Sequence, residues 1–127
     1  MEAEAYLSGS TIIISEDRYA VVKAHQISSP FFAAISDHQE VTLIQKEVDL
    51  NPENTIESET GWRIITFDVF LPFQLTGFLA LVTTKLAEVG ISVFALSSYS
   101  TDHILVKEIQ LSLAMDKLRE AGVNIEE

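Results

Sequence analysis

The sequence predicts an α+β fold in which strands and helices follow one another in the order βαββαβ. Two observations support this prediction. Between Gly61 and Gly122, apolar residues recur with a period of two in some segments and with helical spacing in others, and glycines or polar turns separate these segments. Because right-handed crossovers place both helices on one face of an antiparallel sheet, this order predicts the ferredoxin-like arrangement.

The first predicted strand covers residues 62–70. Ile65, Phe67 and Val69 lie on one of its faces, whereas the other face mixes apolar and polar residues. This alternation is typical of a strand with one buried face. Pro72 ends the strand, because proline lacks the amide hydrogen that a strand ladder requires and restricts the residue before it.

A helix is predicted next, beginning at Thr76 and ending at Gly90. Its apolar residues fall at spacings of three and four, so they form one stripe that can pack on a sheet. These residues are Leu75, Leu79, Val82, Leu86 and Val89. Thr76 can cap the first turn, and Gly90 can adopt the left-handed conformation that often ends a helix.

The remaining elements of this half are two strands, a helix and a short final strand. The strands at residues 91–96 and 103–107 are joined by the polar turn 97–102, and so short a link predicts an antiparallel pair. The pattern of apolar residues predicts a helix over residues 111–121, which a glycine ends. Residues 123–125 are a weak candidate for the fourth strand.

The amino-terminal half predicts a shorter and less regular copy of this order. Strands over residues 11–15 and 19–24 flank a polar turn and predict a hairpin. The sequence Ser-Ser-Pro predicts the start of a short helix over residues 31–36. A strand over residues 41–47 follows, and residues 48–60 are predicted to be a polar linker.

A short similarity between the halves suggests an internal repeat. Residues 40–44 and residues 102–106 both begin with an acidic residue and end with two aliphatic ones. We therefore expect two tandem units. Residues 1–60 form a shortened first unit with its linker, and residues 61–127 form the complete second unit.

The composition limits the classes of function. The chain has 127 residues with 19 acidic and 8 basic side chains, a formal net charge of −11, so nucleic acids and anionic membranes would be repelled. The absence of cysteine excludes disulfides, thiolate catalysis and cysteine-based zinc sites. The first residues are acidic and no apolar run approaches the roughly 18 residues of a membrane span. These features predict a cytoplasmic protein.

The start of the predicted second-unit helix is a candidate for binding a carboxylate. The amides of about Thr76, Gly77 and Phe78 have no partner within the helix and lie at the positive end of its dipole. Gly77 has no side chain to keep a ligand from the backbone. Both features also have a structural explanation, since Thr76 can cap a helix without a ligand and Gly77 can allow close packing.

The predicted turn between the last two long strands is a candidate for binding an amine. Asp102 offers a carboxylate to an ammonium group, and Ser98, Ser100 and Thr101 offer hydroxyl groups. Together with the helix start, this turn predicts a site that holds an α-amino acid by both of its charges. The alternative is that Asp102 serves the backbone of its own turn.

The segments 75–80, 86–91 and 97–106 together resemble an ACT domain. More narrowly, the chain resembles bacterial stand-alone tandem ACT proteins, which are similar to aspartate kinase regulatory domains and to the CASTOR-type arginine sensors of animals. The resemblance implies a regulatory module without catalysis, in which a free amino acid binds between ACT units. The residues it implies as ligand contacts are Phe73, Gln74, Leu75, Thr76 and Gly77 on one side and Tyr99, Thr101 and Asp102 on the other. With Ser98, which the turn itself suggests, nine residues are predicted to contact the ligand.

One departure from the arginine sensors concerns the identity of the ligand. Those proteins carry an acidic loop before the helix, whereas this chain has Gln74 and Leu75, so arginine does not fit well. Phe73, Leu75 and Tyr99 instead predict a partly apolar pocket for a smaller or less basic amino acid. The same three side chains are equally compatible with covering the core.

Other chemistries find little support. His25, His38 and His103 lack the spacing of metal ligands, and Asp102 and His103 point to opposite faces of their strand. The serines at positions 97, 98 and 100 lack a nucleophile-elbow motif and a histidine placed to activate them. We therefore predict no catalysis, no cofactor and no metal.

The sequence as a whole predicts a regulatory protein that binds a free amino acid and forms a homodimer. An exposed sheet edge and a ligand site between units both favour association of two copies. The alternative function is a ligand-free interaction module that docks onto a metabolic enzyme through the same helix faces.

Overall fold

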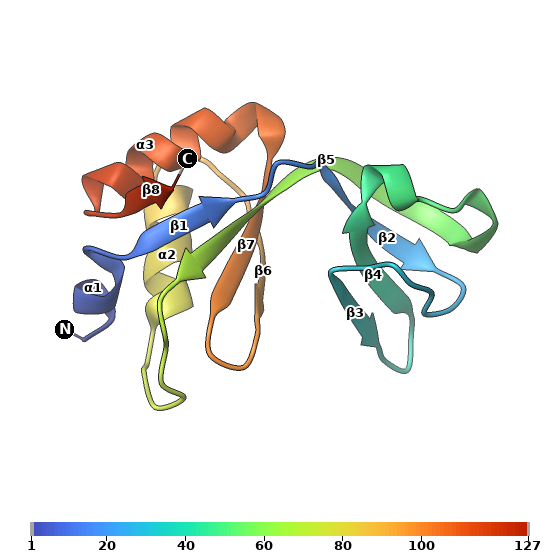
Figure 1. The fold of residues 1–127 in the computed structure, drawn as a ribbon, viewed down its shortest axis with the longest axis horizontal. Coiled ribbons are helices and arrows are strands. Elements are labelled where there is room, and N and C mark those ends of the chain that lie inside the picture. The colour runs from blue at the N-terminus through green and yellow to red at the C-terminus, as the bar shows by residue number, and fades with distance from the viewer. Residues whose placement is uncertain (1, 127) are drawn as a thin grey trace. The chain divides into compact units, whose positions relative to one another are not determined.

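The fold was analysed in a computed structural model that describes residues 2–126 (Figure 1). The chain divides into two compact units. Residues 2–15 and 63–126 form the first, which we call the helical unit, and residues 16–62 form the second, which we call the strand unit. Strand β5 (Thr55–Asp68) contributes its first part to the strand unit and its second part to the helical unit.

The helical unit carries the βαββαβ order on a mixed sheet. Besides the second part of β5, its elements are α1 (Glu2–Leu7), β1 (Thr11–Ile14), α2 (Phe78–Ala87), β6 (Phe94–Ser97), β7 (Asp102–Lys107), the 3-10 turn η3 (Glu108–Gln110), α3 (Leu111–Glu120) and β8 (Asn124–Glu126). The strand order is β8-β1-β5-β7-β6. Without β1, this is the strand order of the ferredoxin-like fold, so the predicted α+β fold class is confirmed.

One apolar core joins the helices to the sheet of this unit. Phe67 on β5 is fully buried and packs edge to face against Phe78 at the start of α2, with ring centroids 5.3 Å apart. Both helices contribute to the same core through Val82, Leu86, Ala114 and Leu118. Because these residues and Phe67 lie in one cluster, α2 and α3 cover the same face of the sheet.

Strand β1 occupies an unexpected place in the helical unit. The predicted hairpin of residues 11–15 and 19–24 is wrong, because β1 pairs antiparallel with β5 and parallel with β8. Ile12 of β1 is fully buried in the core of the helical unit, which explains the choice of partner. The weak candidate strand near the carboxyl terminus is present as β8, and the Asn124 amide donates to the carbonyl of Ser10.

The strand unit is a sheet with the order β3-β4-β2-β5, formed by β2 (Tyr19–Ala24), β3 (Ala33–Ser36), β4 (Val41–Lys46) and the first part of β5. Two 3-10 turns, η1 (Glu47–Asp49) and η2 (Pro52–Asn54), connect β4 to β5. Its core is small and centres on Ala20, Val22, Ala24 and Leu43.

Two predictions for this region are corrected by the structure. The short helix predicted over residues 31–36 is strand β3, which pairs antiparallel with β4. Six residues are too few to form a stable isolated helix, whereas the β4 edge satisfies their backbone groups directly. The predicted linker over residues 48–60 is strand from Thr55 onward, because Glu57, Ser58 and Glu59 pair with β2.

The division of the chain differs from a single boundary at residue 60. Residues 2–15 belong with the carboxyl-terminal residues, since β1 and α1 supply Ile12 and Leu7 to the core of the helical unit. That the strand unit corresponds to a shortened repeat stays a prediction. Among residues 2–126, no helix has both the length and the apolar character to cross a membrane.

Candidate functional site

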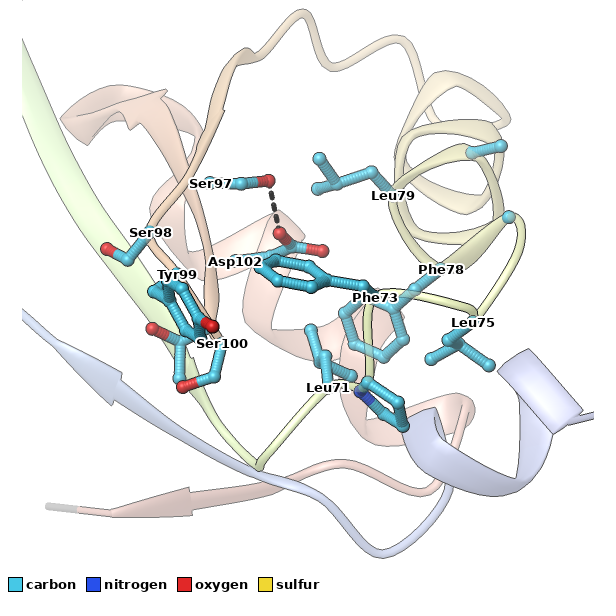
Figure 2. A pocket seen from close by; sticks show the side chains of 14 residues that line it. Leu71, Phe73, Leu75, Phe78, Leu79, Ser97, Ser98, Tyr99, Ser100 and Asp102 are labelled. Atoms are coloured by element: carbon cyan, nitrogen blue, oxygen red, sulfur yellow. Dashed lines mark hydrogen bonds between the residues drawn. The ribbon is translucent and has the colours of Figure 1, made fainter.

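The helical unit contains an open cleft of about 430 Å³ between the loop after β5, the first turn of α2 and the β6–β7 turn (Figure 2). This volume lies within the roughly 300–1,000 Å³ of small-molecule sites. The residues that line it are Leu71, Pro72, Phe73, Leu75, Gly77, Phe78, Leu79, Ala80, Ser97, Ser98, Tyr99, Ser100, Thr101 and Asp102.

The first turn of α2 faces the cleft without a side-chain cap. Gly77 is the residue before the helix, and its φ of 82° lies in the left-handed region that glycine adopts without strain. No side chain hydrogen-bonds to the helix start at this position. The amides of Phe78, Leu79 and Ala80 therefore lack partners within the helix and lie at the positive end of its dipole.

This helix start corrects the prediction in one respect. Thr76 does not cap the helix, because its hydroxyl donates to the carbonyl of Gln74 at 3.4 Å instead. The helix begins at Phe78, so the unpaired amides lie about two residues later in the chain than expected.

Asp102 places a carboxylate on the opposite wall of the cleft. It is the first residue of β7 and lies directly across the ladder from Ser97 at the end of β6. The Ser97 hydroxyl donates to Oδ1 of Asp102. Figure 2 shows the other carboxylate oxygen pointing toward α2. Asp102 is the only charged residue among those that line the cleft.

Two backbone hydrogen bonds shape the wall formed by the β6–β7 turn. The Ser98 amide donates to the carbonyl of Thr101 at 2.8 Å, which closes the turn. The Leu71 amide donates to the carbonyl of Ser100 at 2.8 Å, which joins the turn to the loop after β5. The two loops that form this end of the cleft are therefore held together by the backbone.

An aromatic pair spans the same two loops. The rings of Phe73 and Tyr99 meet at 60°, with centroids 4.8 Å apart. Figure 2 shows the Phe73 ring extending from its loop toward the β6–β7 turn. Both side chains stay mostly exposed, Phe73 at 73% and Tyr99 at 81%.

A hydrogen-bonded histidine lies behind the turn. His103 is buried, its Nε2 is 2.6 Å from the Ser98 hydroxyl and its Nδ1 is 2.9 Å from the Thr66 hydroxyl. Burial lowers the pKa of His103 below its ordinary value, and the neighbouring Asp102 carboxylate offsets part of this shift. The sequence showed no histidine placed to activate these serines, whereas the structure brings His103 within hydrogen-bond distance of Ser98.

This contact does not make Ser98 a nucleophile in the cleft. Asp102 and His103 are neighbours on a strand, so their side chains point to opposite faces of the sheet. Figure 2 shows the Ser98 hydroxyl turned away from the cleft, on the side opposite to Asp102. The three side chains of Thr66, His103 and Ser98 therefore form a supporting chain behind the β6–β7 turn.

Seven of the nine predicted contact residues line the cleft: Phe73, Leu75, Gly77, Ser98, Tyr99, Thr101 and Asp102. Gln74 lies in a neighbouring hollow of about 250 Å³, which Phe70 also lines. Thr76 lines neither space. Whether these residues bind a ligand stays a prediction.

Of the other lining residues, the Phe78 amide and the Ser100 hydroxyl were candidates from the sequence, whereas Leu71, Pro72, Leu79, Ala80 and Ser97 were missed. Ser97 was open to prediction from the hairpin register, since a six-residue polar segment between two strands places its first and last residues opposite each other. Leu79 was assigned only to the core stripe, yet it is partly exposed and its side chain reaches the cleft. Among residues 2–126, no group of three or more histidine or carboxylate side chains is arranged to hold a metal ion.

Solved structures of bacterial proteins share this fold. A protein from Agrobacterium tumefaciens is 20% identical, with 92% of each chain covered and a TM-score of 0.76. A Vibrio cholerae protein is 22% identical, with 95% of this chain and 96% of that chain covered and a TM-score of 0.76. The regulatory subunit of aspartate kinase from Thermus thermophilus is 8% identical, with 91% of this chain and 97% of that chain covered and a TM-score of 0.64. No curated protein matches the sequence.

At these identities the solved structures show similarity of fold alone. Membership of a family is shown instead by a match between the sequence and a family model. The model of the family described as the ACT domain matches residues 57–120. The match spans β5 from residue 57 onward, both long helices and the β6–β7 hairpin, so it includes every residue that lines the cleft. The chain belongs to the ACT domain family, and its fold resembles the regulatory domains of aspartate kinases.

Proposed function

We propose that this protein is a regulatory ACT protein that binds a free amino acid in the cleft of the helical unit, without catalysis. Membership of the family and the similarity to the regulatory subunit of an aspartate kinase support a regulatory role. The groups that line the cleft support an amino acid as the ligand. A cytoplasmic location stays part of this proposal.

The observation that carries the proposal is the pairing of two complementary groups across one cleft. The uncapped start of α2 offers amide hydrogens and a positive dipole to a carboxylate. Asp102 offers one carboxylate oxygen to an ammonium group, while Ser97 holds the other. An α-amino acid carries both complementary charges, as an ammonium and a carboxylate group on the same carbon, so one small molecule can offer a group to each wall.

The arrangement of the serines supports binding rather than turnover. Ser97 donates to Asp102, and Ser98 is turned toward His103 on the other side of the sheet. Neither hydroxyl is both activated by a base and directed into the cleft, which nucleophilic catalysis requires.

We also propose that two copies associate through the edge of the helical unit. Strand β6 pairs with β7 alone among the described strands, so its other edge presents unpaired backbone groups. Strand addition by a second copy would satisfy these groups. The molecular mass in solution, measured by light scattering with and without ligand, tests this proposal.

Thermal denaturation with each of the twenty amino acids tests the function. A ligand at 100 times its Kd stabilises the folded state by about 2.7 kcal/mol, so a true ligand raises Tm in a concentration-dependent way. Asp102→Asn should abolish this rise, because it removes the charge that pairs with the ammonium group. Asp68→Asn is the matched control, since Asp68 is an exposed aspartate of β5 that does not line the cleft.

Two outcomes would contradict the proposal. In one, none of the twenty amino acids changes Tm or releases heat in calorimetry. In the other, Asp68→Asn and Asp102→Asn weaken binding equally. If no amino acid binds and Asp102→Ala leaves the binding of a protein partner intact, the docking of this protein onto an enzyme becomes the better explanation.

A further inference from the structure

We infer that the ligand of this cleft is an α-amino acid with an uncharged, apolar side chain, which lies against Phe73 and Leu79. This inference rests on the function proposed above and names the chemical class of its ligand. Three features of the cleft lead to it: its single charge, the apolar side chains in its lining and its exposed aromatic pair.

The charge of the cleft matches one ammonium group and no more. Asp102 is the only charged residue among those lining the cleft, and Ser97 occupies one of its two carboxylate oxygens. A second cation at the end of a lysine or arginine side chain would be desolvated with no anion beside it. An acidic side chain would equally find no lysine or arginine in the lining. A side chain without charge avoids both costs.

Part of the lining around this charge is apolar, and the β6–β7 turn adds hydroxyl side chains. The loop after β5 contributes Leu71 and Phe73, and the first turn of α2 contributes Leu79. Figure 2 shows the free oxygen of Asp102 pointing toward the opposite wall, from which Leu79 extends. A ligand held by its amine at Asp102 therefore has apolar surface within reach of its side chain, and burying that surface favours binding.

The aromatic pair offers exposed apolar surface to the side chain of a ligand. Phe73 and Tyr99 hold their rings edge to face, although each is more than two-thirds exposed, at 73% and 81%. Large apolar groups that stay exposed together often mark a binding surface. The hydrogen bond from the Leu71 amide to Ser100 keeps the two loops in place, so the pair is available to contact a ligand without a large rearrangement.

A homologous series of amino acids tests the inference by calorimetry. Alanine, 2-aminobutyrate, norvaline and norleucine differ by one methylene each, and burial of one methylene increases affinity about fourfold. We expect the affinity to rise along this series. Norleucine should also bind more tightly than lysine, which has a similar chain length but ends in a second ammonium group.

The outcomes separate this inference from the function on which it rests. If lysine binds as tightly as norleucine, or if the series shows no increase while a polar amino acid binds, the apolar class is wrong and amino acid binding stands. If no amino acid binds at all, both proposals fail.

A pair of phenylalanine variants locates the side-chain contact. Phe73→Ala should weaken norleucine binding about tenfold and alanine binding much less, because only the longer side chain reaches this ring. Phe70→Ala is the matched control, since Phe70 is 70% exposed on the same loop but does not line the cleft. We expect it to leave both affinities unchanged. Equal affinities in Phe73→Ala and the unchanged protein, with Tm values that show both are folded, would overturn the assignment.

Discussion

The two units of this chain are built on sheets but differ in what covers them. In the helical unit, α2 and α3 bury large side chains such as Phe67 and Leu86 in one extended core. In the strand unit, residues 16–62 contain no α-helix, and the core consists mainly of small residues such as Ala20 and Ala24. The comparison shows that a helix, rather than the sheet alone, creates the candidate site.

The reason lies in what a helix start provides and a strand cannot. The first turn of α2 presents three amides without helix partners and a dipole end across the cleft from Asp102, whereas the amides of β2 and β4 are paired with neighbouring strands. The strand unit therefore has no equivalent of the cleft between a helix start and a hairpin. It instead exposes apolar side chains such as Phe31, Phe32 and Ile35 around its edge strand β3.

Large-to-small substitutions in the two cores should show the greatest difference. Phe67→Ala removes a fully buried ring that packs on Phe78, and we expect it to lower the free energy of unfolding by about 3–5 kcal/mol. Leu43→Ala, at the centre of the small core of the strand unit, should cost about 2 kcal/mol, near the lower end for such substitutions. Urea denaturation measures both values. A larger loss for Leu43→Ala would contradict the comparison of the two cores.

Alanine substitutions at two glycines with the same backbone conformation distinguish an effect on stability from an effect on binding. Gly77 of the helical unit and Gly61 of the strand unit have φ values of 82° and 83°, and neither has an atom within 4 Å of an added Cβ. Alanine at either position should therefore cost roughly 1–2 kcal/mol of stability from strain alone. Only Gly77→Ala should also weaken amino acid binding, because Gly77 lines the cleft. Equal effects on binding would argue against the site.

The part of the helical unit from β5 onward was also the part whose order of elements could be predicted. Its signals are local: the helical stripe through Val82 and Leu86 and the alternation around Phe67 each lie within one element. The β6–β7 hairpin fixes Asp102 beside its turn through a register that spans only a few residues. The predicted contact residues came mostly from the resemblance to the ACT domain, and seven of the nine line the cleft.

The failures concern contacts between residues that are distant in the sequence. Nothing near β1 indicates that it pairs with β5 and β8 rather than with β2, because that choice depends on burial of Ile12 in a core built mostly by the other end of the chain. The contact of His103 with Thr66 joins positions 37 residues apart. The residue at which α2 begins is set by the left-handed conformation of Gly77. The sequence did not show this, because Thr76 just before it is also a suitable capping residue.

The buried histidine predicts a pH dependence that belongs to the helical unit. The pKa of His103 in the folded state lies below its ordinary value of 6.5, so the unfolded chain binds a proton first as the pH falls. Its contribution to stability is therefore complete above about pH 6.5 and is lost as the pH falls through the folded pKa. His103→Gln, which can still hydrogen-bond to a hydroxyl, should remove this part of the pH dependence.

Urea denaturation measures the free energy of unfolding of the His103→Gln variant and of the unchanged protein from pH 7.5 to pH 5. Both proteins have the same carboxylates, so a difference between their pH dependences comes from His103. His38→Gln in the strand unit is the control, because His38 is exposed. The prediction fails if the His103→Gln protein loses stability over this range as steeply as the unchanged protein does.

The smallest effect is expected from the surface ion pair between the two helices. Lys117 of α3 lies with its Nζ 3.1 Å from Oε1 of Glu88, the residue after α2. The Glu88 side chain is 56% exposed, so solvent screens the pair and Glu88→Gln should cost no more than about 0.5 kcal/mol. Raising the salt concentration should reduce this cost further. Because the apolar core rather than this pair holds α2 on the sheet, amino acid affinity should not change, and a loss of affinity in calorimetry would show that the position of α2 depends on its surface charges.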